Sequence, residues 1–248
     1  MDILFAPMQG YTDARFRQKH HALMGGVKAY YAPFARWERG RLRDKERRDL
    51  LPERNRNVPT VPQVIAKDRD ELARLCDSLQ RMGWDRIDLN MGCPFPMQYN
   101  SGRGSGLLPR PETVSTMLEE MRQRHDVAFS VKMRLGLTDR EESMRLLPML
   151  NDAPLVLVTM HPRLGMQQYR GTVDREGFEA FYEGCSRPLA YNGDIKSVDD
   201  IARIAKRYPR IAAVMIGRGL IEHPRLAMEW AAIQQQRRQA PAGSQTTG

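Results

Sequence analysis

Short apolar runs alternate along the chain with longer stretches in which apolar residues recur every three or four positions. Runs such as 155–160 (LVLVTM) and 212–217 (AAVMIG) are continuously apolar, which is typical of strands buried on both faces of a parallel sheet. Eight strands are predicted: Ile3–Met8, Val27–Phe34, Thr60–Ala66, Arg86–Met91, Phe129–Leu135, Leu155–His161, Pro188–Asn192 and Ala212–Ile216.

The intervening stretches predict amphipathic helices. The clearest pattern places Leu72, Leu75, Cys76, Leu79 and Met82 on one face, at three- and four-residue steps. Seven helices are predicted in all: Asp13–Met24, Asp68–Met82, Pro111–His125, Arg140–Asn151, Arg175–Glu183, Ser197–Tyr208 and Pro224–Arg238.

Eight strand–helix units of this kind predict an α/β fold, a parallel eight-stranded TIM (β/α)₈ barrel. An open doubly wound sheet is the alternative. The barrel is favoured because polar residues and glycines recur where the strands end, which is where a barrel keeps its active site. We expect the barrel to occupy residues 1–238 without a full second domain, followed by a disordered tail at 239–248.

The connection from Phe34 to Thr60 breaks this rhythm and has only a weak helical pattern. Its segment Arg36–Arg56 holds nine basic and five acidic residues, within a chain whose net charge is +9. Two interpretations stay open. The segment is either a solvated helix and loop linked by salt bridges, or a surface that contacts the backbone of a nucleic acid.

The N-terminal stretch lacks the features of a signal peptide, and no window approaches the length of apolar sequence that a membrane span needs. The three cysteines are too few and too scattered for a disulfide framework or a zinc site. We therefore expect a soluble, cytoplasmic protein without a metal.

Several residues at the strand ends carry chemistry. Gly193 and the run Gly217–Gly219 follow the last two strands, where barrels frequently bind phosphate, although glycine also serves ordinary tight turns. Arg218 would be the cationic partner of such a phosphate. Lys132 and His161 interrupt or end apolar strands, which favours contact with a ligand ring or its phosphate-bearing chain.

Cys93 is the one cysteine at the expected mouth of the barrel, in the run Gly92–Pro94. A thiol there is either a nucleophile or a proton donor, since its ordinary pKa near 8.5 keeps it mostly protonated at neutral pH. Cys76 and Cys185 lie on helical patterns and are expected to pack in the core.

Eight stretches together resemble the dihydrouridine synthase family, flavoenzymes that reduce uridine in RNA. They occur in the family's order, and the run DLNMGCP makes the set specific. The matches are APMQGYTD (6–13), PQVIA (62–66), DLNMGCP (88–94), GRGSGLL (102–108), VKMRLG (131–136), HPR with QQYRG (161–171), YNGDI (191–195) and MIGRG (215–219).

The resemblance implies a TIM barrel that holds FMN at its C-terminal face. Cys93 would be the general acid, and Asn90 and Arg134 would lie near the uracil. The residues implied to contact the flavin are Pro7, Met8, Gln63, Lys132 and His161, and those implied to hold its ribityl and phosphate groups are Asn192, Gly193, Asp194, Gly217 and Arg218.

The implied activity is reduction of uridine to 5,6-dihydrouridine in tRNA, with NADPH as reductant, a hydride from reduced FMN and a proton from Cys93. The target base must leave its stack, and an Arg-rich surface would hold the RNA; we expect a monomer. Alternatives are the same chemistry on ribosomal RNA or on a small pyrimidine, and an RNA-binding paralogue without turnover.

The chain departs from the family pattern in three places. Pro96 stands where most members have lysine, and Leu164 stands where threonine is usual. Only 29 residues follow Gly219, so we expect the helical domain that the family normally adds to be absent. These departures bear on the RNA substrate, since the flavin motifs are intact.

Overall fold

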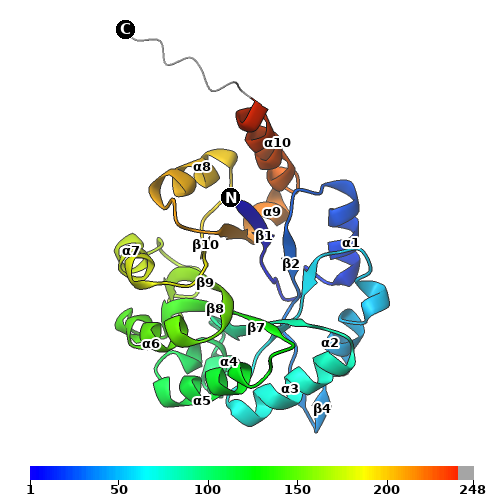
Figure 1. Ribbon diagram of the computed structural model, residues 1–248, viewed down its shortest axis with the longest axis vertical. Coiled ribbons are helices and arrows are strands. Elements are labelled where there is room, and N and C mark those ends of the chain that lie inside the picture. The colour runs from blue at the N-terminus through cyan, green and yellow to red at the C-terminus, as the bar shows by residue number, and fades with distance from the viewer. Residues whose placement is uncertain (240–248) are drawn as a thin grey trace.

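The computed structural model describes residues 1–239 and contains a nine-stranded parallel sheet. Its strands, in the order in which they pair, are β5 (Thr60–Val61), β2 (Ala29–Tyr31), β1 (Asp2–Phe5), β11 (Ala213–Ile216), β10 (Leu189–Asn192), β9 (Leu155–Leu164), β8 (Ala128–Gly136), β7 (Arg86–Met91) and β6 (Gln63–Val64). Because β5 and β6 are halves of one interrupted strand, the sheet closes into the predicted eight-stranded barrel (Figure 1).

Pro62 causes that interruption. The sequence predicts one strand over Thr60–Ala66, but proline has no N–H to donate to a neighbouring strand. β5 therefore pairs only with β2, whereas β6 pairs with β7, and the carbonyl of Pro62 accepts a hydrogen bond from the N–H of Asp88 at 2.9 Å. The break lies where the ring closes.

The helices surround the barrel. All seven predicted helices are confirmed within three residues at each end, and the short helices α2, α4 and α9 were not predicted. The helices are α1 (Ala14–Leu23), α2 (Asp44–Asp49), α3 (Arg69–Arg81), α4 (Pro96–Tyr99), α5 (Pro111–Arg122), α6 (Glu141–Asp152), α7 (Arg175–Gly184), α8 (Val198–Arg207), α9 (Arg218–Glu222) and α10 (Leu226–Gln239), with 3₁₀ turns η1 (Pro52–Arg54) and η2 (Gly104–Leu107).

The Arg-rich connection folds as a hairpin followed by α2. Strands β3 (Trp37–Glu38) and β4 (Arg41–Leu42) pair antiparallel around a turn at Arg39 and Gly40, both of which have positive φ, as a tight hairpin turn requires. Leu42 and Leu50 are buried and attach the hairpin and α2 to the core. The sequence did not predict this hairpin, because its strands are two residues long.

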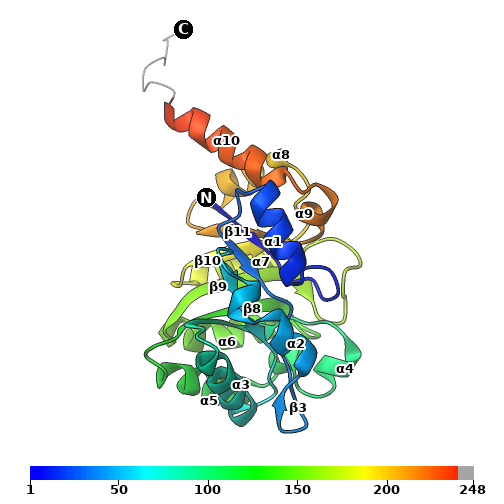
Figure 2. The same cartoon turned by 90° about the vertical axis from the view of Figure 1, so that its right-hand side faces the viewer.

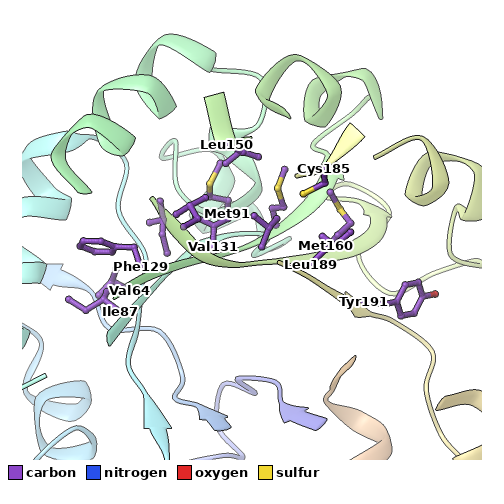
Figure 3. Close-up of a cluster of buried hydrophobic side chains, with 14 of the residues drawn as sticks. Val64, Ile87, Met91, Phe129, Val131, Leu150, Met160, Cys185, Leu189 and Tyr191 are labelled. Carbon is purple, nitrogen blue, oxygen red and sulfur yellow. The ribbon is translucent and has the colours of Figure 1, made fainter. Parts of the chain in front are cut away.

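Two apolar layers hold the barrel together. The larger lies between the sheet and the helices, and Figure 3 shows part of it, including Met91, Val131, Met160 and Leu150. The cysteines Cys76 and Cys185 belong to this layer, as expected. A smaller cluster that includes Leu4, Tyr31, Val61 and Met215 lies on the other face of the same strands, inside the barrel.

Figure 2 shows the barrel from the side, with the N-terminus on the left and α4, which follows β7, on the right. The carboxyl ends of the strands therefore open on the right. Within residues 1–239, none of the helices is both long and apolar enough to cross a membrane. The tail expected at 239–248 lies outside the described residues apart from Gln239, which ends α10.

Candidate active site

The carboxyl ends of the strands surround a cavity of about 340 Å³. Every residue that the sequence assigns to the site lines it: Pro7, Met8, Gln63, Asn90, Cys93, Lys132, Arg134, His161, Asn192, Gly193, Asp194, Gly217 and Arg218. The expected convergence on one face of the barrel is confirmed, and the chemical role of each residue stays a prediction.

Asp88 on β7 lies inside the barrel with its carboxylate fully buried. Its two oxygens accept hydrogen bonds from Ser130 Oγ at 2.6 Å and from Gln63 Nε2 at 2.7 Å. Burial raises the pKa of Asp88 to about 6, and the two hydrogen bonds offset only part of that rise. Because an ionised carboxylate only accepts, Asp88 fixes which end of the Gln63 amide faces it.

The Gln63 amide carries this orientation to the cysteine loop. Its Oε1 accepts a hydrogen bond from Asn90 Nδ2 at 2.8 Å, which turns Asn90 Oδ1 toward the loop. That oxygen accepts from the N–H groups of Gly92 at 3.0 Å and Cys93 at 2.8 Å. Asn90 thus positions the Cys93 loop as well as lining the cavity.

Cys93 itself is buried at the wall of the cavity. Its carbonyl accepts hydrogen bonds from the N–H and the hydroxyl of Ser105, at 3.1 and 2.9 Å. Burial raises the pKa of the Cys93 thiol, so the sulfur keeps its proton at neutral pH. Pro96, which replaces the lysine of the family pattern, is the first residue of α4, where the missing N–H of proline leaves no bond unmade.

Arg134 joins two loops at the mouth. It is fully buried, and its guanidinium donates to the carbonyls of Gly92 at 2.9 Å, Leu164 at 2.8 Å and Gln168 at 2.6 Å. Burial lowers the pKa of Arg134 to about 10, which leaves it charged at neutral pH. The resemblance to the family implies a position near the uracil, which stays a prediction; the structure shows that Arg134 holds the Cys93 loop against the loop after β9.

Lys132 and His161 face the cavity from adjacent strands. Burial and the neighbouring Arg134 lower the pKa of Lys132 to about 8, and within the described residues its ammonium forms no salt bridge. Burial and the same cationic surroundings lower the pKa of His161 well below its ordinary value, so the ring is neutral. His161 Nε2 lies 3.1 Å from Nη1 of Arg163; because arginine only donates, the ring proton sits on Nδ1.

Arg163 is a site residue that the sequence did not assign. Almost fully buried, it forms a bidentate pair with Asp194, at 3.0 and 2.6 Å, and donates to the carbonyl of Gly171 at 2.8 Å. Both oxygens of Asp194 are therefore engaged, and its charge is neutralised beside the glycines expected to bind phosphate. The signal available in the sequence was an arginine two positions after His161 in an otherwise apolar strand.

The expected phosphate end is built on close approach of the backbone. A Cβ at Gly217 would lie 3.0 Å from Met8 Sδ, and one at Gly219 would lie 2.1 Å from the carbonyl oxygen of Ile195. Neither position has room for a side chain without movement, which accounts for both glycines. Arg218 is half-exposed at the rim, 3.6 Å from Asp194.

Aromatic side chains that the sequence did not assign also line the cavity. They include Tyr11, Phe34, Phe95 and Tyr169. The guanidinium carbons of Arg134 and Arg218 lie 5.5 and 5.1 Å from the centre of the Tyr169 ring. The mouth therefore combines flat apolar rings with positive charge.

A family model for dihydrouridine synthases matches residues 4–246. The chain belongs to the dihydrouridine synthase family. The resemblance found in the sequence motifs is thereby confirmed.

Relatives of this dihydrouridine synthase chain include two bacterial proteins. The tRNA-dihydrouridine(16) synthase of Neisseria meningitidis serogroup A is 28% identical over 235 residues, which cover 92% of this chain and 70% of that protein. The tRNA-dihydrouridine synthase B of Shewanella oneidensis is 26% identical over 226 residues, which cover 90% and 68%. The chain therefore spans about 70% of the length of these relatives.

Solved structures support the fold. Histamine dehydrogenase from Rhizobium sp. 4-9 superimposes with a TM-score of 0.70 at 14% identity, over 95% of this chain and 46% of that one. At this identity the likeness shows the barrel architecture alone.

Proposed function

We propose that this dihydrouridine synthase chain reduces uridine to 5,6-dihydrouridine in tRNA, with FMN as cofactor and NAD(P)H as reductant. The observation that carries the proposal is the cavity at the mouth of the barrel, where Cys93, Lys132 and two glycine-containing loops meet. Within residues 1–239 Lys132 forms no salt bridge. The names of the two bacterial relatives supply the RNA class.

The residues present fit FMN. A cavity of about 340 Å³ lies within the range of about 300–1,000 Å³ usual for ligand pockets. Lys132, Arg134, Lys196 and Arg218 line it, against the single carboxylate of Asp194, which Arg163 already neutralises. This excess of positive charge suits a phosphate and an electron-rich ring. Pro7, Met8, Gln63, Lys132 and His161 would contact the ring, and Asn192, Gly193, Asp194, Gly217 and Arg218 would hold the ribityl and phosphate groups.

The chemistry divides between the cofactor and the chain. Reduction of the uracil 5,6 double bond adds one hydride and one proton, and bound FMN, once reduced by NAD(P)H, supplies the hydride. The chain supplies the proton from Cys93 Sγ, which is protonated because burial raises its pKa. Lys132, protonated below pH about 8, offsets negative charge that develops on the uracil.

The Cys93 loop is positioned from both sides. The chain of hydrogen bonds from Asp88 through Gln63 and Asn90 fixes its N–H groups, and Arg134 fixes the carbonyl of Gly92. A proton donor held in this way meets the substrate in one orientation, which is the main requirement for general acid catalysis.

The Arg-rich hairpin and α2 fit a contact with the RNA backbone. Arg36, Arg41 and Arg43 form salt bridges with acids of the same segment, as expected for a solvated helix and loop linked by salt bridges. In contrast, Arg39, Lys45, Arg47, Arg48, Arg54 and Arg56 are exposed and form no salt bridge within the described residues. This unpaired set is available to phosphates.

The test is a map of dihydrouridine, position by position, in total RNA from cells that lack the gene, from their parent, and from the mutant complemented with the wild type or with Cys93→Ala. Loss at one tRNA position, restored by the wild type and not by Cys93→Ala, supports the proposal. Loss confined to ribosomal RNA would keep the chemistry and change the substrate. No loss anywhere, with purified protein that lacks the flavin absorbance bands, would favour a binding-only paralogue.

A further inference from the structure

Exposed large apolar side chains gather at the mouth of the barrel. Within residues 1–239 seven such side chains are exposed, and five of them follow strands β1, β7 and β9 at their carboxyl ends. These five, between 44% and 75% exposed, are here named the apolar rim: Tyr11, Phe95, Met97, Met166 and Tyr169.

The rim surrounds the opening. In the closed ring β1 and β7 are separated by two strands, β7 and β9 by one, and β9 and β1 by two. Its members therefore approach the cavity from three directions, with other side chains between them. Tyr11, Phe95 and Tyr169 line the cavity directly, and Met97 and Met166 stand within three residues of Phe95 and Tyr169. The apolar rim thus consists of three separate small patches around the opening of the cavity.

We infer that the apolar rim stacks on the nucleobases next to the uridine being reduced, so that the protein selects uridine within an unpaired stretch of RNA. The inference rests on the proposed function for the presence of RNA at this mouth. Separate small apolar patches can each stack on one base of an unpaired strand. A folded protein partner would instead need one continuous apolar patch.

Charge at the mouth favours the same occupant. Lys196 and Arg218 line the cavity after β10 and β11, the two strands between β9 and β1, so positive charge lies between two groups of the rim. Lys196, which is exposed, is the cation not assigned to the FMN phosphate. Rings interleaved with cations form the combination that binds single strands without regard to sequence, because the cations take the phosphates and the rings take the bases. Binding would then require an unpaired nucleotide on each side of the target uridine, whichever base that nucleotide carries.

The chain offers matched controls. The two remaining exposed apolar residues, Leu23 and Val156, lie at the end of α1 and near the start of β9, which places them at the opposite end of the barrel. Leu23→Ala and Val156→Ala each remove an exposed apolar side chain without touching the mouth. Tyr11→Phe keeps a ring where Tyr11→Ala removes it.

The experiment measures binding of flavin-loaded protein to a short single-stranded RNA with one uridine, and to the same RNA with abasic nucleotides on both sides of that uridine. We expect Tyr11→Ala and Phe95→Ala each to weaken binding to the intact RNA by about 5- to 100-fold, and Tyr11→Phe and both controls to leave it within about twofold. On the abasic RNA, the alanine variants should bind as the wild type does, because the stacking partners are missing.

Equal losses on both RNAs, or no loss on either, would overturn the inference. A difference in sedimentation between the rim variants and the wild type, measured without RNA, would also overturn it. Such a difference would mean that the apolar rim forms a contact between copies of the chain. Dihydrouridine formation by the wild type is measured in parallel on a tRNA transcript, with NADPH added as the reductant. Its absence counts against the proposed function, whereas unchanged binding by the rim variants counts against this inference alone.

Discussion

Replacing Asp88 by asparagine separates the charge of the buried carboxylate from its hydrogen bonds. In Asp88→Asn the side-chain oxygen still accepts from Gln63 Nε2, and the new amide donates to Ser130 Oγ, whose own hydrogen turns elsewhere. The Gln63 and Asn90 amides keep their orientation, so we expect the variant to retain RNA reduction. What the substitution removes is a charge enclosed by the barrel.

The size of the effect follows from the pKa of Asp88, which burial raises from 3.8 to about 6. The folded protein therefore binds this proton more tightly than the unfolded chain, and its stability falls as pH rises between those two values. A change of this size corresponds to about 3 kcal/mol. The attraction of Lys132 lowers this pKa and is already included in it, so about 3 kcal/mol is the net difference expected.

Chemical denaturation between pH 4 and pH 8 measures the difference. The free energies of unfolding of Asp88→Asn and of the wild type should be similar near pH 4, separate as pH rises from 4 to 6 and stay apart above 6, with the variant the more stable. Asp88→Ala is the contrast, because it leaves two buried donors unpaired at about 1–3 kcal/mol each and releases Gln63. If Asp88→Asn is less stable than the wild type at pH 8, the reasoning is refuted and the ionised carboxylate stabilises the fold.

Three further predictions concern the site. Cys93→Ala should keep the flavin absorbance bands while dihydrouridine formation falls by about 10²-fold or more, measured by nucleoside mass spectrometry. Single-turnover reduction should slow above pH about 8 as Lys132 loses its proton, and Lys132→Met should be slow at every pH and lack this limb. Arg163→Leu should lower the free energy of unfolding by about 1–3 kcal/mol, because both oxygens of Asp194 lose the hydrogen bonds from Arg163 and only the half-exposed Arg218 remains near them. The same variant should weaken FMN binding measured by titration, whereas Arg203→Leu, which removes an exposed arginine from α8, should do neither.

The barrel could be predicted because its signals are local and repeated. Continuous apolar runs indicate strands covered on both faces, and α3 shows how far periodicity reaches: Leu72, Leu75, Cys76 and Leu79 are all fully buried, as predicted. The break at Pro62 and the hairpin at Arg39 were missed. Both depend on where a strand pairs, which a short segment does not reveal by its own pattern.

The site could be predicted as a set because barrels bring all strand ends to one face, and every assigned residue lines the cavity. Arg163 and Asp88 were not assigned, because their importance lies in partners distant in the sequence, Asp194 and Gln63. In the structure Arg134 also joins two loops through hydrogen bonds to their carbonyl groups, which the sequence did not predict. Sequence reasoning identified which residues meet, and the three-dimensional arrangement shows which of them hold the others in place.

The most direct test of the central claim is reconstitution with purified components. Protein loaded with FMN is incubated with NADPH and an unmodified tRNA transcript, and dihydrouridine is counted at each position by mass spectrometry. The account predicts dihydrouridine at a defined uridine, dependent on both NADPH and Cys93. Flavin-loaded protein that oxidises NADPH yet forms no dihydrouridine at any position, in tRNA transcripts of every sequence from the source cell, would contradict it.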